Sequence, residues 1–136
     1  MNPNNQAIHC LTGNIPENIY QQLPFPIYDL RIIEFLSELS KEISVLVKRD
    51  EKFSIFIYFA LWSRKSNLLR LKSNINDLSK RYGRGVALHI APSNVVTNIL
   101  FTLAFGLLSG CPSIVRISKK NEKDILPICN LITQLL

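Results

Sequence analysis

The stretch GRGVALHIAPSN, residues 83–94, decides the fold of this 136-residue chain. Its opening glycines are a turn signal, and the apolar run 86–90 is typical of a buried strand. The proline–serine–asparagine that closes it precedes a helix expected over 95–109, which Ser93 or Asn94 is suited to cap. That helix is apolar nearly all round, so we expect neighbouring elements to bury it on all sides.

A second strand follows the expected helix. Gly110 suits the helix C-terminus, Pro112 prevents its continuation, and the run 113–117 is again of buried-strand type. Two apolar strands joined by a helix predict a right-handed parallel crossover and the α/β class. Ligands of such sheets bind at the carboxyl ends of the strands, which here means residues 91–94 and 118–120.

The chain before the first strand reads differently. Residues 1–28 are punctuated by four prolines and predict an irregular arm. Asp29 suits the N-cap of an amphipathic helix over 30–48. The aromatic-rich segment 52–66 predicts a helix, although its residue types also permit a strand, and a third helix is expected over 68–80.

The last segment predicts one more helix. It opens at 121–124, with Pro127 in its first turn, where a missing N–H is tolerated. The sequence therefore divides into an irregular arm, 1–28, a helical lead-in, 29–82, and a segment built around the crossover, 83–136.

Composition leaves two rival functions open. The chain is 47% hydrophobic and only 19% charged, and its mean hydropathy of +0.15 is high for a small domain. A membrane-associated protein would use 95–111 as its span. The net charge is +6, and the basic residues are concentrated in 64–84. Such a basic stretch is typical of either a solvated helix face or a surface that binds phosphate. A nucleic-acid-binding module would use that segment, with Trp62 and Tyr82 stacking on bases.

The cysteines and the N-terminus indicate a cytoplasmic protein. Cys10, Cys111 and Cys129 form no C-x-x-C pair, so neither a metal site nor a disulfide framework is expected. Residues 1–6 lack the basic and apolar regions of a secretory signal. His89 lies in a buried-strand pattern and is expected to be a hydrogen-bonded core histidine.

The block 83–95 resembles the signature of bacterial acyl-CoA reductases, the fatty-acid reductases of bioluminescence and a branch of the aldehyde dehydrogenase superfamily. LAFGLLSG at 103–110, IVR at 114–116 and LWSRKSN at 61–67 are similar to further segments of that family. The resemblance is dense over residues 58–120. It implies an aldehyde-dehydrogenase-like Rossmann domain, of which 83–136 forms the first half.

The resemblance also implies a reaction, the NADPH-dependent conversion of fatty acyl thioesters to fatty aldehydes. Asn94 corresponds to the superfamily's asparagine that donates to the carbonyl oxygen. Arg116 stands at the basic position that touches the adenosine ribose, and an arginine there favours NADPH because it grips a 2′-phosphate. The remaining cofactor-binding residues implied are Ala91, Pro92, Ser93, Ser118 and Lys119.

The chain departs from the family in several places. Val96 replaces a frequent proline and Cys111 a frequent asparagine, and neither change removes an assigned chemical group. The family's cysteine nucleophile lies far downstream, and Cys111 cannot be carried over as that residue. We therefore expect the N-terminal portion of a reductase, inactive and poorly soluble by itself. When full length, it is expected to be oligomeric and to work with acyl transferase and synthetase partners.

Overall fold

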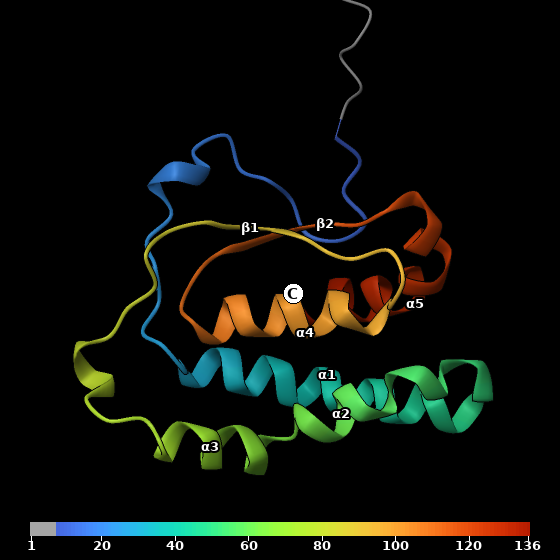
Figure 1. Cartoon of the computed structure of the whole chain (residues 1–136), viewed down its shortest axis with the longest axis horizontal. Coiled ribbons are helices and arrows are strands. Elements are labelled where there is room, and N and C mark those ends of the chain that lie inside the picture. The colour runs from blue at the N-terminus through green and yellow to red at the C-terminus, as the bar shows by residue number, and fades with distance from the viewer. Residues whose placement is uncertain (1–7) are drawn as a thin grey trace, which may run out of the picture.

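A computed structural model describes residues 8–136 of the chain. The first seven residues of the irregular arm expected over 1–28 lie outside this range. The elements are α1 (Leu30–Arg49), α2 (Ile57–Trp62), α3 (Lys65–Ser73), β1 (Ala87–Ile90), α4 (Thr97–Leu108), β2 (Ser113–Arg116) and α5 (Lys119–Leu135), with short 3-10 helices at Ile19–Gln21, Glu51–Phe56 and Leu78–Lys80. Figure 1 shows the two strands above α4, with α1, α2 and α3 below it.

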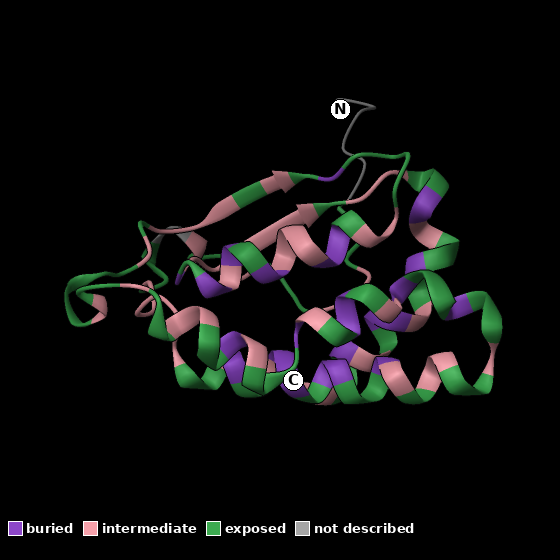
Figure 2. Cartoon of the chain, turned by 60° about the horizontal axis from the view of Figure 1, so that its bottom comes forward, coloured by how far each residue is buried: buried purple, intermediate pink, exposed green. Residues whose placement is uncertain are grey.

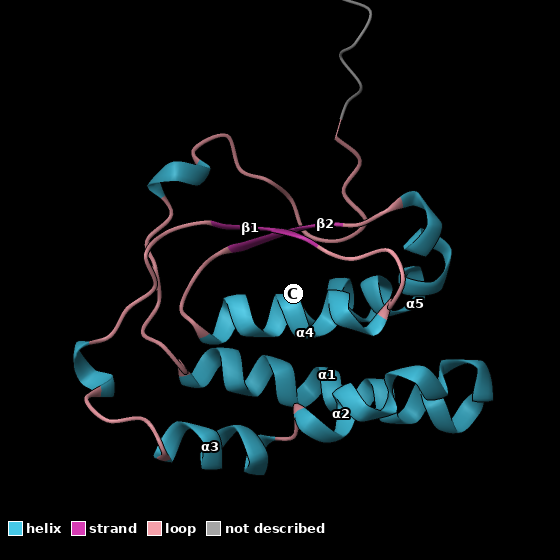
Figure 3. Cartoon of the chain, in the orientation of Figure 1, coloured by secondary structure: helices cyan, strands magenta, loops and turns pink. Residues whose placement is uncertain are grey.

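The two strands pair in parallel, as the sequence predicts. Ala87 lies opposite Ser113 and Ile90 opposite Arg116, and α4 connects the strands (Figure 3). The expected burial of these strands is wrong. Leu88 and Ile90 are 67% and 71% exposed, because α4 covers only the face on which their neighbour His89 lies. The described residues thus form a mixed helix and strand structure with one covered sheet face.

The core lies between the sheet-covering α4 and the helices beneath it (Figure 2). One stripe of α1 is fully buried at three- and four-residue steps, the spacing that places side chains on one helix face. The largest fully buried hydrophobic side chains are Ile33, Leu36, Leu39, Ile43, Phe56, Phe59, Leu68, Leu100, Ile125 and Ile128. Each removes an apolar side chain from water, which stabilises the fold by roughly 1.5–3 kcal/mol before entropy is counted.

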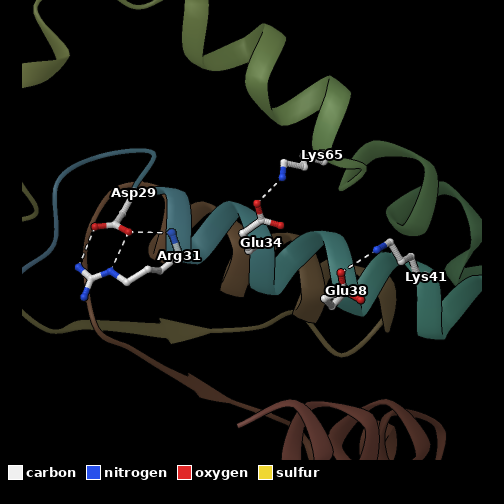
Figure 4. A network of polar contacts seen from close by, with 6 residues as sticks. All are labelled: Asp29, Arg31, Glu34, Glu38, Lys41 and Lys65. Atoms are coloured by element: carbon white, nitrogen blue, oxygen red, sulfur yellow. Dashed lines mark hydrogen bonds and ion pairs between the residues drawn. The ribbon is translucent and has the colours of Figure 1, made fainter.

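The predicted amphipathic helix is confirmed as α1. Asp29 is its N-cap and accepts from the Arg31 backbone N–H at 2.8 Å. The Arg31 guanidinium also donates to both carboxylate oxygens, which holds the pKa of Asp29 below its usual value. On the polar side of α1, Lys41 pairs with Glu38 at 2.7 Å and Lys65 of α3 pairs with Glu34 (Figure 4).

The segment after α1 is helical, so the strand alternative for 52–66 is wrong. The segment forms two pieces, the 3-10 helix Glu51–Phe56 and the α-helix α2. The next helix, α3, begins at Lys65, three residues before the start expected from the sequence. The helix expected over 68–80 ends earlier, at Ser73. The chain there leaves the helix, and Asp77 adopts a left-handed conformation (φ 56°) that no continuous helix permits.

Helix α4 differs from its prediction at its start and in its burial. It begins at Thr97 with Val96 as N-cap, so neither Ser93 nor Asn94 caps it. Phe105 is 54% exposed, so the helix is not buried on all sides. Its 12 residues span about 18 Å, against a bilayer core of about 30 Å. No helix within residues 8–136 is both long and apolar enough to cross a membrane.

The arm is attached at the C-terminal end of α4. Gly110 (φ 77°) terminates this helix, as predicted, with its N–H bonded to the Leu107 carbonyl at 2.9 Å. The Phe25 N–H donates to Gly110 at 2.8 Å, and the Tyr28 N–H donates to Leu108 at 2.8 Å. These bonds satisfy carbonyls that the end of a helix leaves without partners.

Helix α5 begins at Lys119, earlier than expected. Pro127 consequently lies inside the helix and not in its first turn, so that prediction is wrong. The reason is a tight turn directly after β2, in which the Asn121 N–H donates to the Ser118 carbonyl at 2.9 Å. At Pro127 the helix lacks the N–H that would bond to the carbonyl four residues earlier.

Candidate active site

The carboxyl ends of β1 and β2 lie side by side, because the two strands are parallel and in register (Figure 1). The Ala91 N–H extends the pairing beyond β1 by donating to the Arg116 carbonyl at 3.1 Å. This brings the loop 91–96 next to the turn 117–118, which leads into α5. The predicted meeting of the two strand-end segments is confirmed.

Asn94 lies exposed in the loop between β1 and α4, as do its neighbours Pro92 and Ser93. Since α4 begins at Thr97 and no side chain caps its first turn, the Asn94 amide has no capping role here. A carboxamide carries two N–H donors. Asn94 therefore offers uncommitted hydrogen-bond donors beside the carboxyl ends of the strands.

Arg116 is the last residue of β2 and is exposed. Its partner in the sheet register is Ile90, and among the ion pairs of residues 8–136 none involves Arg116. The strand-end salt bridge that is the ordinary alternative role for such a residue is therefore not formed within the described part of the chain. Its guanidinium is available for a bidentate contact with a phosphate.

Ser118 and Lys119 continue the same edge. The Ser118 hydroxyl oxygen is buried and has no hydrogen-bond partner, although Ser118 occupies the N-cap position of α5. A buried polar atom without a partner costs about 1–3 kcal/mol. Lys119, in the first turn of α5, is exposed. The exposed Arg116 and Lys119 side chains thus place two positive charges three positions apart, on either side of the buried Ser118 hydroxyl.

Asn121 also belongs to this edge, and we did not predict it from the sequence. Its side-chain Nδ2 donates to the Pro92 carbonyl at 3.4 Å, and the residue is only 5% exposed. A sequence signal for it exists. Asn121 falls on the apolar stripe of α5 formed by Ile125, Ile128 and Ile132, so a polar residue occupies a position that packing favours for an apolar one.

His89 lies beneath the sheet, facing α4. Its Nε2 is 3.4 Å from the Ser113 hydroxyl, and a Cβ on Gly106 of α4 would come within 2.6 Å of the same nitrogen. The expected hydrogen bond is confirmed, although the side chain is half-buried and not enclosed in the core. His89 packs between the strands and α4, away from the exposed loop.

Two of the three cysteines, Cys111 and Cys129, lie away from this edge. Cys129 is 3% exposed in the core, as expected for a small apolar residue, and burial raises the pKa of its thiol to about 11. Cys111 is half-buried after the far end of α4. In the part of the chain that the structure describes, no three histidine, cysteine or acidic residues group as metal ligands.

Trp62, two positions before the basic segment 64–84, packs against aromatic side chains of α2 and α4. Trp62 contacts Phe101 and Phe105, each with ring centroids at 5.3 Å, and Phe59 at 6.2 Å. Trp62 therefore joins α2 to α4 and does not lie open to bases, whereas Tyr82 is 58% exposed.

Comparison with known proteins identifies the family. The family model described as Acyl-CoA reductase (LuxC) matches residues 27–130, from just before α1 into α5, and so spans the whole candidate site. Searches of curated proteins and of solved structures gave no match. The match confirms the resemblance predicted from 83–95, and the chain belongs to the acyl-CoA reductase (LuxC) family.

Proposed function

We propose that this chain forms part of the active site of a cytoplasmic, NADPH-dependent reductase that converts long-chain fatty acyl thioesters to fatty aldehydes. The observation that carries the proposal is the hydrogen bond from the Ala91 N–H to the Arg116 carbonyl, inside the family match, which joins the start of the loop that carries Asn94 to the end of β2. In this proposal residues 83–136 are the first half of a Rossmann-like dinucleotide-binding domain. The arm, 1–28, and the helical lead-in, 29–82, precede it.

Asn94 is proposed to act on the substrate. Reduction of a thioester to an aldehyde places negative charge on the carbonyl oxygen whenever a thiolate or a hydride adds to the carbonyl carbon. The carbonyl then re-forms as the carbon–sulfur bond breaks and the sulfur leaves as a thiolate. The exposed Asn94 amide is free to donate to that oxygen. One well-placed donor of this kind lowers a barrier by about 3 kcal/mol.

Arg116, Ser118 and Lys119 are proposed to bind the cofactor, with Ala91, Pro92 and Ser93 bordering it. The Arg116 guanidinium would hold the 2′-phosphate of NADPH. The Ser118 hydroxyl, which is buried and has no partner, would donate to a ribose or phosphate oxygen only after the turn around it exposed it. The cofactor, when bound, supplies the hydride. The exposed Lys119 adds positive charge at the same edge.

This chain alone is proposed to lack reductase activity. An acyl-enzyme step needs an accessible thiolate near Asn94. Cys129 is buried with a raised pKa, and Cys111 follows the opposite end of α4, about 18 Å along its axis. The complete enzyme is proposed to be oligomeric and to act with acyl transferase and synthetase partners.

The test is binding of NADPH and NADH to the purified chain, followed by nicotinamide fluorescence. Arg116→Ala is expected to weaken NADPH binding about ten- to hundredfold and NADH binding much less, because only NADPH presents the 2′-phosphate. Lys123→Ala, an exposed change on α5, serves as the control. Equal losses for both nucleotides would contradict the assignment of Arg116, and aldehyde formation by this chain alone would contradict its proposed inactivity.

A further inference from the structure

The loop that carries Asn94 is held at its beginning by two hydrogen bonds. The Ala91 N–H donates to the Arg116 carbonyl at 3.1 Å. Pro92 has no N–H, and its carbonyl accepts from the Asn121 side chain at 3.4 Å. Beyond Pro92 the loop is exposed until Val96 enters the start of α4. The direction in which Asn94 leaves the sheet is therefore set at the carbonyl that Asn121 binds.

The hydrogen bond to Pro92 is the one side-chain hydrogen bond that Asn121 makes within the described residues. Asn121 lies in the first turn of α5, on the buried stripe that continues through Ile125 and Ile128. Packing alone favours an apolar side chain at such a position, since a buried amide must find a partner to compensate for its lost hydration. The partner in the structure is the Pro92 carbonyl, which lies 29 positions earlier in the chain.

We propose that Asn121 is a positioning residue for Asn94. By holding the Pro92 carbonyl it orients the loop 91–94, so that the Asn94 amide projects over the edge that also carries Arg116. The importance of this orientation rests on the proposed function, in which Asn94 donates to the substrate oxygen. The contact itself is a property of the chain without substrate or cofactor.

The substitution that separates the hydrogen bond from the packing is Asn121→Asp. It preserves the size and shape of the side chain but replaces the donor with an acceptor that faces the Pro92 carbonyl. The matched control is Asn130→Asp, the same change at an exposed position of the same helix. Both variants change the net charge equally, but only Asn121→Asp also buries a carboxylate, which lowers stability whatever the role of the contact. The order of the loop, and not the stability, therefore reports the contact with Pro92.

The measurement is backbone ¹⁵N relaxation on the whole 136-residue chain. In the unaltered chain the order parameters of Ser93 and Asn94 are expected to lie near 0.8, and Asn121→Asp is expected to lower them below about 0.6. The order parameters of α4 are expected to stay near 0.85 in all three chains, and those of Ser93 and Asn94 are expected to stay near 0.8 in the Asn130→Asp control. If Asn121 only packs, the variant will lose thermal stability while the loop order parameters stay unchanged, and that result would overturn the proposal.

A second measurement needs no variant, so it can still overturn the proposal if Asn121→Asp does not fold. The side-chain amide protons of Asn121 are expected to exchange with solvent at least about tenfold more slowly than those of exposed Asn130. Equal rates would overturn the proposal. Both experiments omit substrate and NADPH, so they test the contact independently. A rigid, Asn121-dependent loop in a chain that fails to bind NADPH would reject the proposed function and leave the positioning of the loop intact.

Discussion

Gly110 stands where three segments of the chain meet. It ends α4 in a left-handed conformation, its carbonyl accepts from Phe25, and a Cβ built on it would lie 2.1 Å from the Phe25 carbonyl oxygen. Gly83 approaches the same point, and its N–H donates to Phe25 at 3.0 Å. The sequence indicates Gly110 as a helix terminator. The close contact with the arm also requires a glycine there, and local sequence patterns do not reveal that contact.

Gly110→Ala is expected to lower the free energy of unfolding by about 3 kcal/mol or more. Roughly 1–2 kcal/mol comes from the left-handed backbone, and the rest comes from the clash with the Phe25 carbonyl. Gly13→Ala is the control, because Gly13 also has a positive φ, of 67°, but nothing lies within 4 Å of its Cβ position. Urea denaturation of both variants measures the difference, and equal losses would mean that the close approach to Phe25 contributes nothing.

Helices α1 and α5 show why one element is predictable and another is not. The bounds of α1 follow from its own sequence, since the apolar period, the Asp29 cap and the break after Arg49 are all local. The predicted start of α5 lies too late in the chain, because the preference of proline for the first turn of a helix is only a local one. The turn at Ser118 and the packing of Ile125 and Ile128 begin the helix earlier.

Pro127→Ala is expected to stabilise the chain by about 1–3 kcal/mol. Proline is about 3 kcal/mol less favourable than alanine inside a helix, and the substitution restores an N–H that can bond to the Lys123 carbonyl. The loss of the half-buried ring reduces this gain. Thermal and urea unfolding measure the change, with Lys123→Ala expected to stay within about 0.5 kcal/mol. A destabilised Pro127→Ala would show that the chain is adapted to a proline bend in α5.

The arrangement of the molecule explains which of its features could be predicted from the sequence and which could not. The parallel pair, and the edge at which both strands end, were predictable because strand–helix–strand order predicts a parallel crossover. The role of Asn121 was not predicted, since its contact with Pro92 joins positions 29 apart. Burial of the strands was overestimated because an apolar run does not show how many of its faces will be covered.

Part of the apolar composition that gives the chain its high mean hydropathy of +0.15 lies exposed on the uncovered face of the sheet. Leu88 and Ile90 are 67% and 71% exposed, and in the two-stranded sheet of the described residues each strand has an open edge. Exposed apolar strands with unpaired edges promote association between chains. We therefore expect the purified chain to self-associate through this face.

The double substitution Leu88→Lys with Ile90→Glu is expected to raise the monomeric fraction several-fold at a given concentration. It leaves the net charge unchanged and places the new glutamate opposite Arg116 in the sheet register, an oppositely charged pair that favours the strand pairing. Ile8→Glu with Leu23→Lys is the matched control, because it removes two equally exposed apolar side chains of the arm without changing the charge. Sedimentation velocity measures both variants. A control that gains as much monomer would show that general surface hydropathy, and not the sheet face, drives the association.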